Sequence, residues 1–364
     1  MSSTHTIHPT HLDSYRTLGR TGLRVSPLML GTLAFGDPGL GSDRDASLRL
    51  LHRYTDAGGN AVDTANGYAG GRAEETVAQF LRERPGTRDG LVIATKFAGN
   101  MHPGDPNGGG AGRKAIMRQL DASLTRLGTD HIDLYWQHYF DQHTPLEETL
   151  STLQDLVRAG KIRYYGLSDT PAWAVARAAT IAELRGWEPV AAIQAEYSLL
   201  ERTAEGELFG AVRELGIGVV PWSPLAGGVL SGKYTRAERN PAESGRAALP
   251  NTQGMLTDRT FDLLDLLRQI AHEQHVPVSA VALAWLGHRP EVTAPVIGAR
   301  TPEQLEDNLA SLTVSLSEAQ LAELDALTVP ELPFPIGFLR TSGVDLAQGG
   351  ATINGVASRA WRMG

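Results

Sequence analysis

A repeated alternation of short apolar segments with longer amphipathic segments constrains the fold of this chain most strongly. Eight apolar segments that read as buried strands lie at residues 28–32, 61–63, 91–96, 132–138, 163–168, 191–194, 218–222 and 294–297. Eight amphipathic segments follow them, at residues 45–57, 72–84, 113–127, 146–159, 171–184, 203–215, 278–286 and 302–312. Buried strands that alternate with helices are typical of a parallel sheet covered by helices. Eight such units in 364 residues predict an α/β fold of the (β/α)8 type, the TIM barrel. A doubly wound open sheet is the alternative, although no G-x-G-x-x-G motif opens an early helix.

Five segments lie outside this repeat. Residues 15–27 contain two short arms around Thr21-Gly22, which predicts an N-terminal β-hairpin that closes the bottom of the barrel. Residues 223–289 form a long insertion after the seventh strand, with an extra helix at 258–274. A last helix at 318–327 precedes a C-terminal tail at 329–364. The polar residues 1–14 are predicted to be a disordered N-terminal extension, and residues 15–364 a single barrel domain.

The composition excludes several classes of protein. The formal net charge of −8 argues against a nucleic-acid-binding protein that uses a basic face. There is no run of 18 apolar residues, so no membrane-spanning helix is expected. The chain has no cysteine, so it cannot form disulfides or thiolate metal sites, and a cytoplasmic location is expected. His131 and His138 lie on opposite faces of their strand, so no metal site is expected there either.

Ionisable residues stand where three of the predicted strands end. Asp63 ends the second strand, Lys96 the third and His138 the fourth, and Tyr68 follows Asp63 after an Asn-Gly turn. The carboxyl ends of the strands form the active-site mouth in a barrel of this type. We therefore expect these four side chains to converge there. Taken singly, each has a structural explanation, because strands commonly end on polar residues and a lysine can snorkel to the surface.

These four residues suit proton transfer to or from an oxygen atom. The ammonium group of Lys96 would stabilise a Tyr68 phenolate and lower the pKa of Tyr68 from about 10. Asp63 would keep a buried Lys96 charged, and His138 would hydrogen-bond a substrate oxygen. The set contains no nucleophile, so the electrons for a reaction must come from a cofactor.

Seven motifs carry a resemblance to a known family. In chain order they are VDTANGY, VIATKF, IDLYWQH, GLSD, IQAEYSLL, VVPWSPLAGGVLSGKY and VIGARTPEQLEDN. With them the chain resembles the aldo-keto reductases over residues 15–328, and GLSDTPAW and LYWQHYFD resemble the bacterial aryl-alcohol-dehydrogenase-like branch. The resemblance implies a (β/α)8 barrel that binds NADP(H) across its mouth and reduces a carbonyl compound reversibly. It also implies that Tyr68 is the general acid, that Lys96 tunes it, that Asp63 supports Lys96 and that His138 orients the carbonyl.

The same resemblance implies which residues hold the cofactor. Ser168, Asp169 and Gln194 are expected at the nicotinamide carboxamide, with Trp222 stacked on the ring; many relatives have Asn in place of Asp169. Arg300 is expected to bind the 2′-phosphate and to favour NADPH over NADH. The other expected contacts come from the end of the first strand, the loop after the seventh and the start of the eighth helix: Thr32, Ser223, Leu225, Gly227, Lys233, Gly298, Gln304 and Asn308.

The expected substrate pocket is rich in aromatic residues. Phe35, Tyr139 and Phe140 are expected to line it, together with the loop 99–112, the insertion and the tail. These side chains suit an aryl or otherwise apolar aldehyde or ketone, with no nucleic-acid or membrane partner, and a homo-oligomer is left open. Two alternative functions also stay open. One is a barrel that senses NADPH with very slow turnover, and the other is a reductase of a nucleotide-linked keto- or enoyl-sugar.

Overall fold

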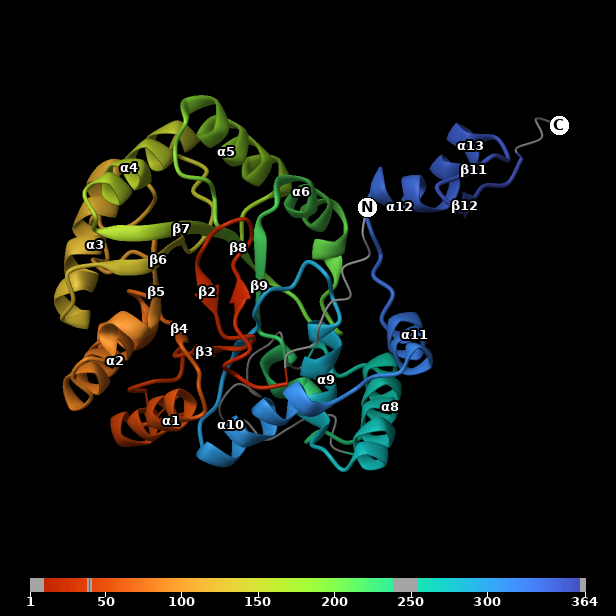
Figure 1. Cartoon of the computed structure of the whole chain (residues 1–364), viewed down its shortest axis with the longest axis horizontal. Helices are drawn as coiled ribbons and strands as arrows, with labels where there is room; N and C mark the ends of the chain where they lie inside the picture. The colour runs from red at the N-terminus through yellow and green to blue at the C-terminus, as the bar shows by residue number, and fades with distance from the viewer. Residues whose placement is uncertain (1–9, 38, 40, 238–253, 361–364) are drawn as a thin grey trace.

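The computed structural model describes residues 10–37, 39, 41–237 and 254–360. Eight parallel strands form its central sheet, in the order β10-β3-β4-β5-β6-β7-β8-β9 (Figure 1). Their bounds are β3 Met29–Gly31, β4 Ala61–Asp63, β5 Val92–Phe97, β6 Ile132–Gln137, β7 Ile162–Ser168, β8 Ala192–Glu196, β9 Gly218–Trp222 and β10 Val296–Ile297. A parallel bridge between Val219 and Val292 joins β9 to the segment before β10, so the barrel is nearly closed. This confirms the predicted (β/α)8 fold.

Helices follow the strands and surround the barrel (Figure 1). They are α1 Arg44–Asp56, α2 Arg72–Glu83, α3 Arg113–Leu127, α4 Leu146–Arg158, α5 Ala172–Arg185, α6 Glu207–Leu215, α8 Asp258–Gln274, α9 Val278–Gly287, α10 Pro302–Leu309 and α11 Glu318–Leu327. Helix α8 is the extra helix predicted within the insertion; residues 238–253 of that insertion lie outside the described part. Several helix starts are encoded locally, because the side chains of Asp43, Thr257, Thr301 and Ser317 accept backbone N–H groups at the first turns of α1, α8, α10 and α11.

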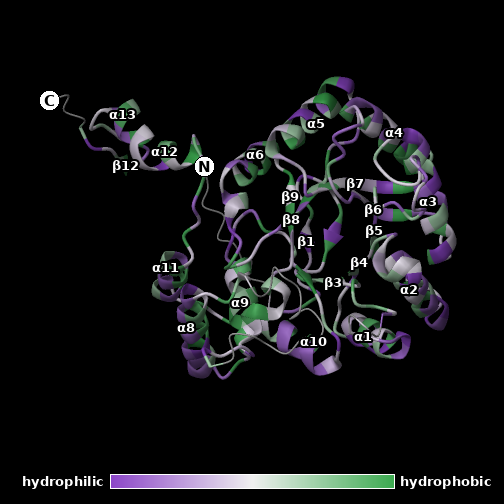
Figure 2. Ribbon diagram, turned by 180° about the vertical axis from the view of Figure 1, so that it is seen from behind, coloured by the Kyte–Doolittle hydropathy of each residue, from purple (hydrophilic) through white to green (hydrophobic). Residues whose placement is uncertain are grey.

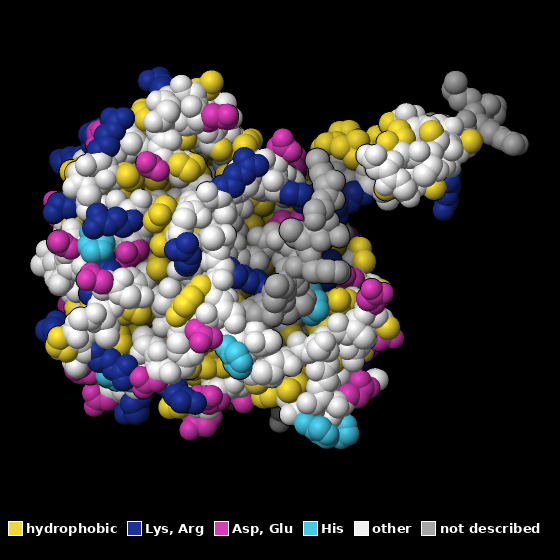
Figure 3. All heavy atoms as spheres, viewed as in Figure 1, with side chains coloured by type: hydrophobic (Ala, Val, Ile, Leu, Met, Phe, Trp, Pro, Cys, Tyr) yellow, Lys and Arg dark blue, Asp and Glu magenta, His cyan; other side chains and the backbone are white. Residues whose placement is uncertain are grey.

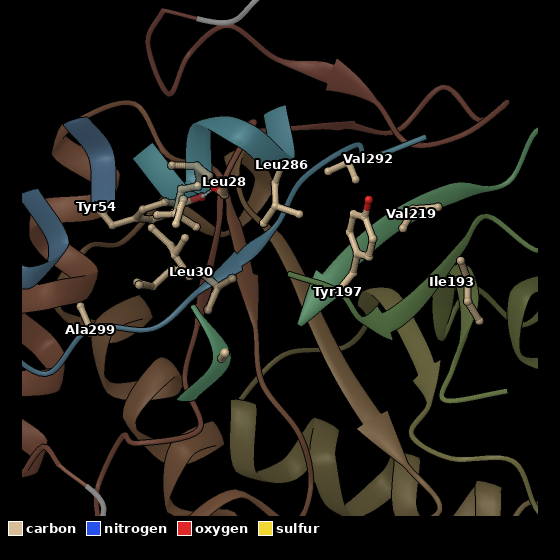
Figure 4. Packing of buried hydrophobic residues seen from close by; sticks show 14 of the residues in the cluster. Leu28, Leu30, Tyr54, Ile193, Tyr197, Val219, Leu286, Val292 and Ala299 are labelled. Atoms are coloured by element: carbon tan, nitrogen blue, oxygen red, sulfur yellow. Dashed lines mark hydrogen bonds between the residues drawn. The ribbon is translucent and has the colours of Figure 1, made fainter. Parts of the chain in front are cut away.

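Two layers of apolar side chains hold the barrel together. The outer layer lies between the strands and the helices and includes Leu30, Tyr54, Ile193 and Val219 (Figure 4). The helices accordingly show mixed hydropathy, with much of their hydrophilic colour on the outside of the ring (Figure 2). The inner layer fills the barrel itself.

The inner layer is centred on the fully buried ring of Trp136. Its neighbour across β6 and β7 is Gly166, where an added Cβ would lie 2.3 Å from the indole ring. A residue without a side chain is therefore needed beside this tryptophan.

The N-terminal hairpin closes the bottom of the barrel, as predicted. Its strands, β1 Arg16–Thr17 and β2 Arg24–Val25, pair antiparallel. Leu18 and Val25 from this hairpin are fully buried in the inner layer. The folded region begins earlier than the sequence predicts, because Leu12 of the predicted disordered extension is buried in the outer layer. Residues 1–9 of that extension lie outside the described part of the chain.

After α11 the chain leaves the barrel as a lateral arm, which we define as residues 330–360 (Figures 1 and 2). The arm contains α12 Ile336–Phe338, a π-helical turn Leu339–Gly343, α13 Val344–Gln348 and the hairpin β11 Thr352–Ile353 with β12 Val356–Ala357. It projects to the side of its own barrel, so the prediction that the tail lines the substrate pocket is wrong for these residues. Within the described residues, no helix is long and apolar enough to cross a membrane.

Candidate active site

The carboxyl ends of β4 and β5 bring together the predicted acid and its partners. Asp63 is the last residue of β4, and Lys96 lies next to the last residue of β5. Tyr68 opens a short 3₁₀ helix just after β4. The turn that leads to it is tied to β5, because Asn66 N–H donates a hydrogen bond to the Lys96 carbonyl oxygen (3.2 Å). Thr32, which is expected to contact the cofactor, is fully buried and donates its hydroxyl to the Asp63 carbonyl oxygen (3.1 Å), so it positions Asp63.

Lys96 is fully buried, and its ammonium group makes three hydrogen bonds. Nζ donates to Asp63 Oδ2 in a close ion pair, to the Thr64 carbonyl oxygen (3.0 Å) and to the Tyr68 hydroxyl oxygen (3.1 Å). The second carboxylate oxygen of Asp63, Oδ1, accepts a hydrogen bond from Gln194 Nε2 (3.0 Å). An ammonium group has three protons, so all of them are used. Because the Tyr68 oxygen accepts one of these bonds, its own proton is available to another acceptor.

Burial sets the protonation states of this cluster. Burial raises the pKa of Tyr68 above its usual value, and the opposing effect of the Lys96 charge is smaller. Burial alone would lower the pKa of Lys96, but the charge of Asp63 and the contacts with Tyr68 hold it above its usual value. The predicted effect of Lys96 on Tyr68 is therefore present, but the prediction of a lowered pKa is wrong for the net shift. Tyr68 is a protonated phenol near neutral pH, as a general acid must be.

His138 directly follows β6 and faces Tyr68. The two rings are edge to face with their centroids 5.8 Å apart, and His138 also stacks on Tyr139 at 4.5 Å. Burial, with a smaller contribution from the Lys96 charge, lowers the pKa of His138 to about 3. Its Nδ1 atom is buried without a hydrogen-bond partner in the described residues. His138 is thus a neutral imidazole that can orient an oxygen atom without titrating near pH 7.

The predicted nicotinamide contacts lie at the ends of β7 and β9 and in the middle of β8. Ser168 ends β7, and its Oγ is buried without a partner in the described residues. Asp169 has a left-handed backbone (φ 44°), and its Oδ1 accepts a hydrogen bond from Trp222 Nε1 (2.9 Å). A buried hydroxyl without a partner is costly unless a ligand supplies one, so Ser168 fits the predicted place beside an amide-bearing ring. Gln194 gives its amide N–H to Asp63, a supporting role that sequence reasoning missed.

The backbone after β9 makes a tight turn that suits an anion. Ser223, Gly227 and Gly228 all have positive φ angles, of 52°, 65° and 95°. Ser223 Oγ accepts a hydrogen bond from Gly227 N–H (3.1 Å), and Leu225 packs against the outer layer. The Lys233 ammonium lies over this turn, because a Cβ on Gly228 would be 3.2 Å from its Nζ. A cation above a glycine-rich turn suits an anionic group, which fits the cofactor contact expected of this loop.

Arg300 follows β10 and packs over the loop after β3. A Cβ added to Gly41 would lie 2.2 Å from Arg300 Cδ, and Ser42 Oγ donates to the Arg300 carbonyl oxygen (3.2 Å). The hydroxyl of Tyr234 is buried without a partner in the described residues, and the Arg300 charge acts on it. Lys233 lies 4.9 Å from the centroid of the same ring. Sequence reasoning missed Tyr234. Its position directly after Lys233, a predicted cofactor contact, is the signal that could have placed it near the cofactor.

Two of the predicted cofactor residues shape the Arg300 loop. Gln304 Oε1 accepts a hydrogen bond from Arg300 N–H (2.9 Å). Asn308 is buried, and its Nδ2 donates to the Gly298 carbonyl oxygen (3.1 Å). Gly298 itself is exposed. Gln304 and Asn308 therefore use these amide groups to hold the loop, and Arg300 itself is exposed.

Aromatic residues gather beside His138. Tyr139 is exposed, and the half-buried Phe140 meets Trp173 edge to face with the ring centroids 5.5 Å apart. Trp173 is 58% exposed and was missed by sequence reasoning, although it belongs to the GLSDTPAW motif. Phe35 is fully buried in the outer layer, so the prediction that it lines the pocket is wrong.

A buried amide pair connects the Tyr68 turn to the loop 99–112. Gln119 Oε1 accepts hydrogen bonds from Asn66 Nδ2 and from Ala98 N–H, both at 2.9 Å. Gln119 Nε2 donates to the Gly110 carbonyl oxygen (3.3 Å). Sequence reasoning missed Gln119, because a glutamine within an amphipathic helix gives no signal for such a contact.

The described residues contain no group of three His, Asp or Glu side chains placed to hold a metal ion. His131 instead bonds to Asp130 (2.7 Å) away from the mouth. The mouth presents proton donors and cations, together with the Ser168 hydroxyl, which has no partner among the described residues.

A model of the aldo/keto reductase family matches residues 27–329, nearly the whole barrel. The chain belongs to the aldo/keto reductase family. It is 38% identical over 320 residues to the uncharacterised oxidoreductase YrpG of Bacillus subtilis, which covers 85% of this chain and 94% of that protein. It is 34% identical over 341 residues to the norsolorinic acid reductase stcV of Emericella nidulans (91% of this chain, 86% of that protein). It is 31% identical over 330 residues to the aryl-alcohol dehydrogenase GME11368 of Pestalotiopsis microspora (88% of this chain, 84% of that protein). Family and relatives support an oxidoreductase that acts on carbonyl groups.

Proposed function

We propose that this aldo/keto reductase catalyses the reversible, NADPH-dependent reduction of an aromatic or otherwise apolar aldehyde or ketone to the alcohol. One observation carries the proposal. The buried ammonium of Lys96, compensated by Asp63, donates a hydrogen bond to the oxygen of Tyr68 (3.1 Å). This arrangement turns the Tyr68 proton toward the mouth and stabilises the negative charge that remains after its transfer.

Three residues of the mouth have different roles in proton transfer. In the direction of reduction, Tyr68 donates its proton to the carbonyl oxygen, and Lys96 stabilises the resulting phenolate. Neutral His138 hydrogen-bonds the same oxygen and orients the carbonyl group. Bound NADPH would supply the hydride to the carbonyl carbon. In the direction of oxidation, the Tyr68 phenolate accepts the alcohol proton.

The cofactor part of the proposal is supported by the donor set along the mouth. Ser168 offers a buried hydroxyl that lacks a partner in the described residues, and Trp222 lies at the end of β9, two strands away from β7. Lys233 and Arg300 supply two cations near Tyr234, whose buried hydroxyl has no partner among the described residues. A guanidinium group at Arg300 favours a dinucleotide that carries an additional phosphate, which is why we propose NADPH over NADH.

The substrate part is supported by the aromatic side chains beside His138. Tyr139 stacks on His138, and Phe140 with Trp173 extends the aromatic surface outward. A flat aromatic carbonyl compound would find ring faces and edges there. The similarity to an aryl-alcohol dehydrogenase supports the same substrate class.

Replacement of Tyr68 by Phe tests the proposal. The oxidation of NADPH is followed over aromatic aldehydes, aliphatic aldehydes, dicarbonyls and keto-sugars, and NADPH binding is followed by quenching of tryptophan fluorescence. Tyr68→Phe should lower kcat by about 10²–10⁴-fold while NADPH still binds. Tyr15→Phe, at an exposed tyrosine away from the mouth, is the matched control. Near-normal rates in Tyr68→Phe would refute the mechanism, and uniformly slow turnover of the unmodified protein would favour a sensing barrel.

A further inference from the structure

The lateral arm and its root, which we define as residues 327–329, expose apolar side chains that the barrel does not cover. Seven of the thirteen large hydrophobic side chains exposed in the described part of the chain lie here: Val329, Phe334, Phe338, Leu339, Leu346, Ile353 and Val356. No described residue from 329 to 360 is buried. Figure 3 shows apolar side chains along the arm, which stands clear of the barrel. A folded segment with this much exposed apolar surface usually marks an interaction site.

The arm nevertheless has a defined structure and direction. Arg259 donates to the carbonyl oxygens of Leu327 (2.6 Å) and Val329 (2.8 Å) at its root. Arg340 donates to the Glu205 carbonyl oxygen (2.6 Å) and ties the π-helical turn to the barrel. Prolines at 330, 333 and 335 stiffen the segment between these two anchors. The aromatic pair Phe334 and Phe338 lies between these two anchors, with the ring centroids 6.2 Å apart, and the two side chains are 83% and 43% exposed.

A matching cavity of about 380 Å³ lies beside the root of the arm. Its lining combines the apolar Leu199, Leu200, Leu263 and Leu327 with the charged Glu201, Arg202, Arg259 and Glu331. We propose that two copies of this chain associate by exchanging arms, so that the aromatic pair Phe334 and Phe338 of each arm packs over the cavity of its partner. Because each cavity adjoins the root of an arm, a two-fold axis beside the two roots brings both contacts together in one self-complementary interface.

The apolar area of the arm is large enough for such an interface. The two phenylalanine side chains alone could bury up to about 300–500 Å² per copy. Two exchanged arms and the surfaces that they cover would then bury more than the roughly 1,000 Å² that a specific interface needs. This comparison favours a second copy of the chain as the occupant of the cavity.

Sedimentation velocity of the full chain over a range of concentrations tests the proposal. The unmodified chain should form a dimer, and Phe334→Asp should raise the dimer Kd by about 30-fold or more, because a charge would enter an apolar contact. Leu184→Asp is the matched control, since Leu184 on α5 is 81% exposed and Phe334 is 83% exposed. A monomer at all concentrations, or an equal effect of both substitutions, would overturn the proposal.

Mixing two variants identifies the contact itself. Leu200→Asp at the cavity should also weaken self-association, with far-UV circular dichroism confirming that the barrel remains folded. In a mixture of Phe334→Asp and Leu200→Asp chains, one intact arm can meet one intact cavity. The mixture should therefore associate more tightly than either variant alone. A mixture that associates no better than the separate variants would rule out arm exchange.

Discussion

Replacement of Asp63 by Asn removes the charge that compensates Lys96 inside the barrel mouth. Lys96 has no exposed surface, and Asp63 is 2% exposed. The asparagine oxygen could still accept a hydrogen bond from Nζ, but the ammonium would lose its counter-charge in a medium that solvates charge poorly. The substitution should therefore destabilise the folded protein even though the shape of the side chain barely changes.

The expected cost follows from the burial of the pair. Loss of one member of a buried ion pair typically costs about 3–5 kcal/mol in the free energy of unfolding. An unfolding entropy of about 2.1 cal/mol/K per residue over 364 residues converts this to a fall in Tm of about 4–7 °C. kcat should fall as well, because Lys96 would no longer be held as a charged donor to Tyr68.

The cost should depend on pH in a defined direction. In the unmodified protein the pKa of Lys96 is raised, so its stabilising effect is present below the unfolded value of about 10.4 and is lost as pH rises through the folded value. In Asp63→Asn, burial without a counter-charge places the folded pKa of Lys96 below the unfolded value. The stability of the variant should then rise with pH up to about 10, so the difference between the two proteins is largest near pH 7.

Urea titrations followed by circular dichroism at about pH 7 and pH 9.5 measure this difference. Lys96→Met supplies the matched background, because it leaves Asp63 as the unpaired buried charge. Asp63→Asn should therefore stabilise the Lys96→Met protein, although it destabilises the unmodified one. A cost below about 1 kcal/mol at pH 7, or a cost that does not change with pH, would refute the assignment of a buried ion pair.

Three further predictions concern the rest of the mouth. Because burial lowers the pKa of His138 to about 3, its imidazole NMR signals should not titrate between about pH 5 and pH 8, and a midpoint near 6.5 would contradict its neutral role. Gln119→Leu leaves the Asn66 amide and the Ala98 N–H without their acceptor. We therefore expect a loss of about 2 kcal/mol in the free energy of unfolding and about a tenfold fall in kcat. The same substitution at exposed Gln269 should change neither quantity, and equal effects of the two substitutions would argue that Gln119 does not hold the Tyr68 turn. Arg300→Ala should raise the NADPH Kd by about 10–30-fold with little change for NADH, as measured by fluorescence quenching, and a parallel loss for both would show that Arg300 does not contact the 2′-phosphate.

Local patterns made most of the barrel predictable. Each strand is a short apolar run and each helix has an amphipathic period, so their existence depends on few distant contacts. The proximity of Asp63, Lys96 and His138 could be predicted because the carboxyl ends of parallel strands meet at one face of a barrel. Tyr68 joined them because it follows a turn just beyond Asp63.

Contacts between distant segments decided what the pattern could not. The sign of the net pKa shift at Tyr68 depends on how deeply the cluster is buried, which no local stretch encodes. Gln194 turns to Asp63, and Gln304 and Asn308 turn to the Arg300 loop, because three-dimensional packing decides which partner an amide meets. The local periodicity of the sequence thus determined the barrel and the positions of its acid–base residues. The tertiary structure alone decided which side chains hydrogen-bond to those residues and where the arm runs, because both depend on contacts between distant segments.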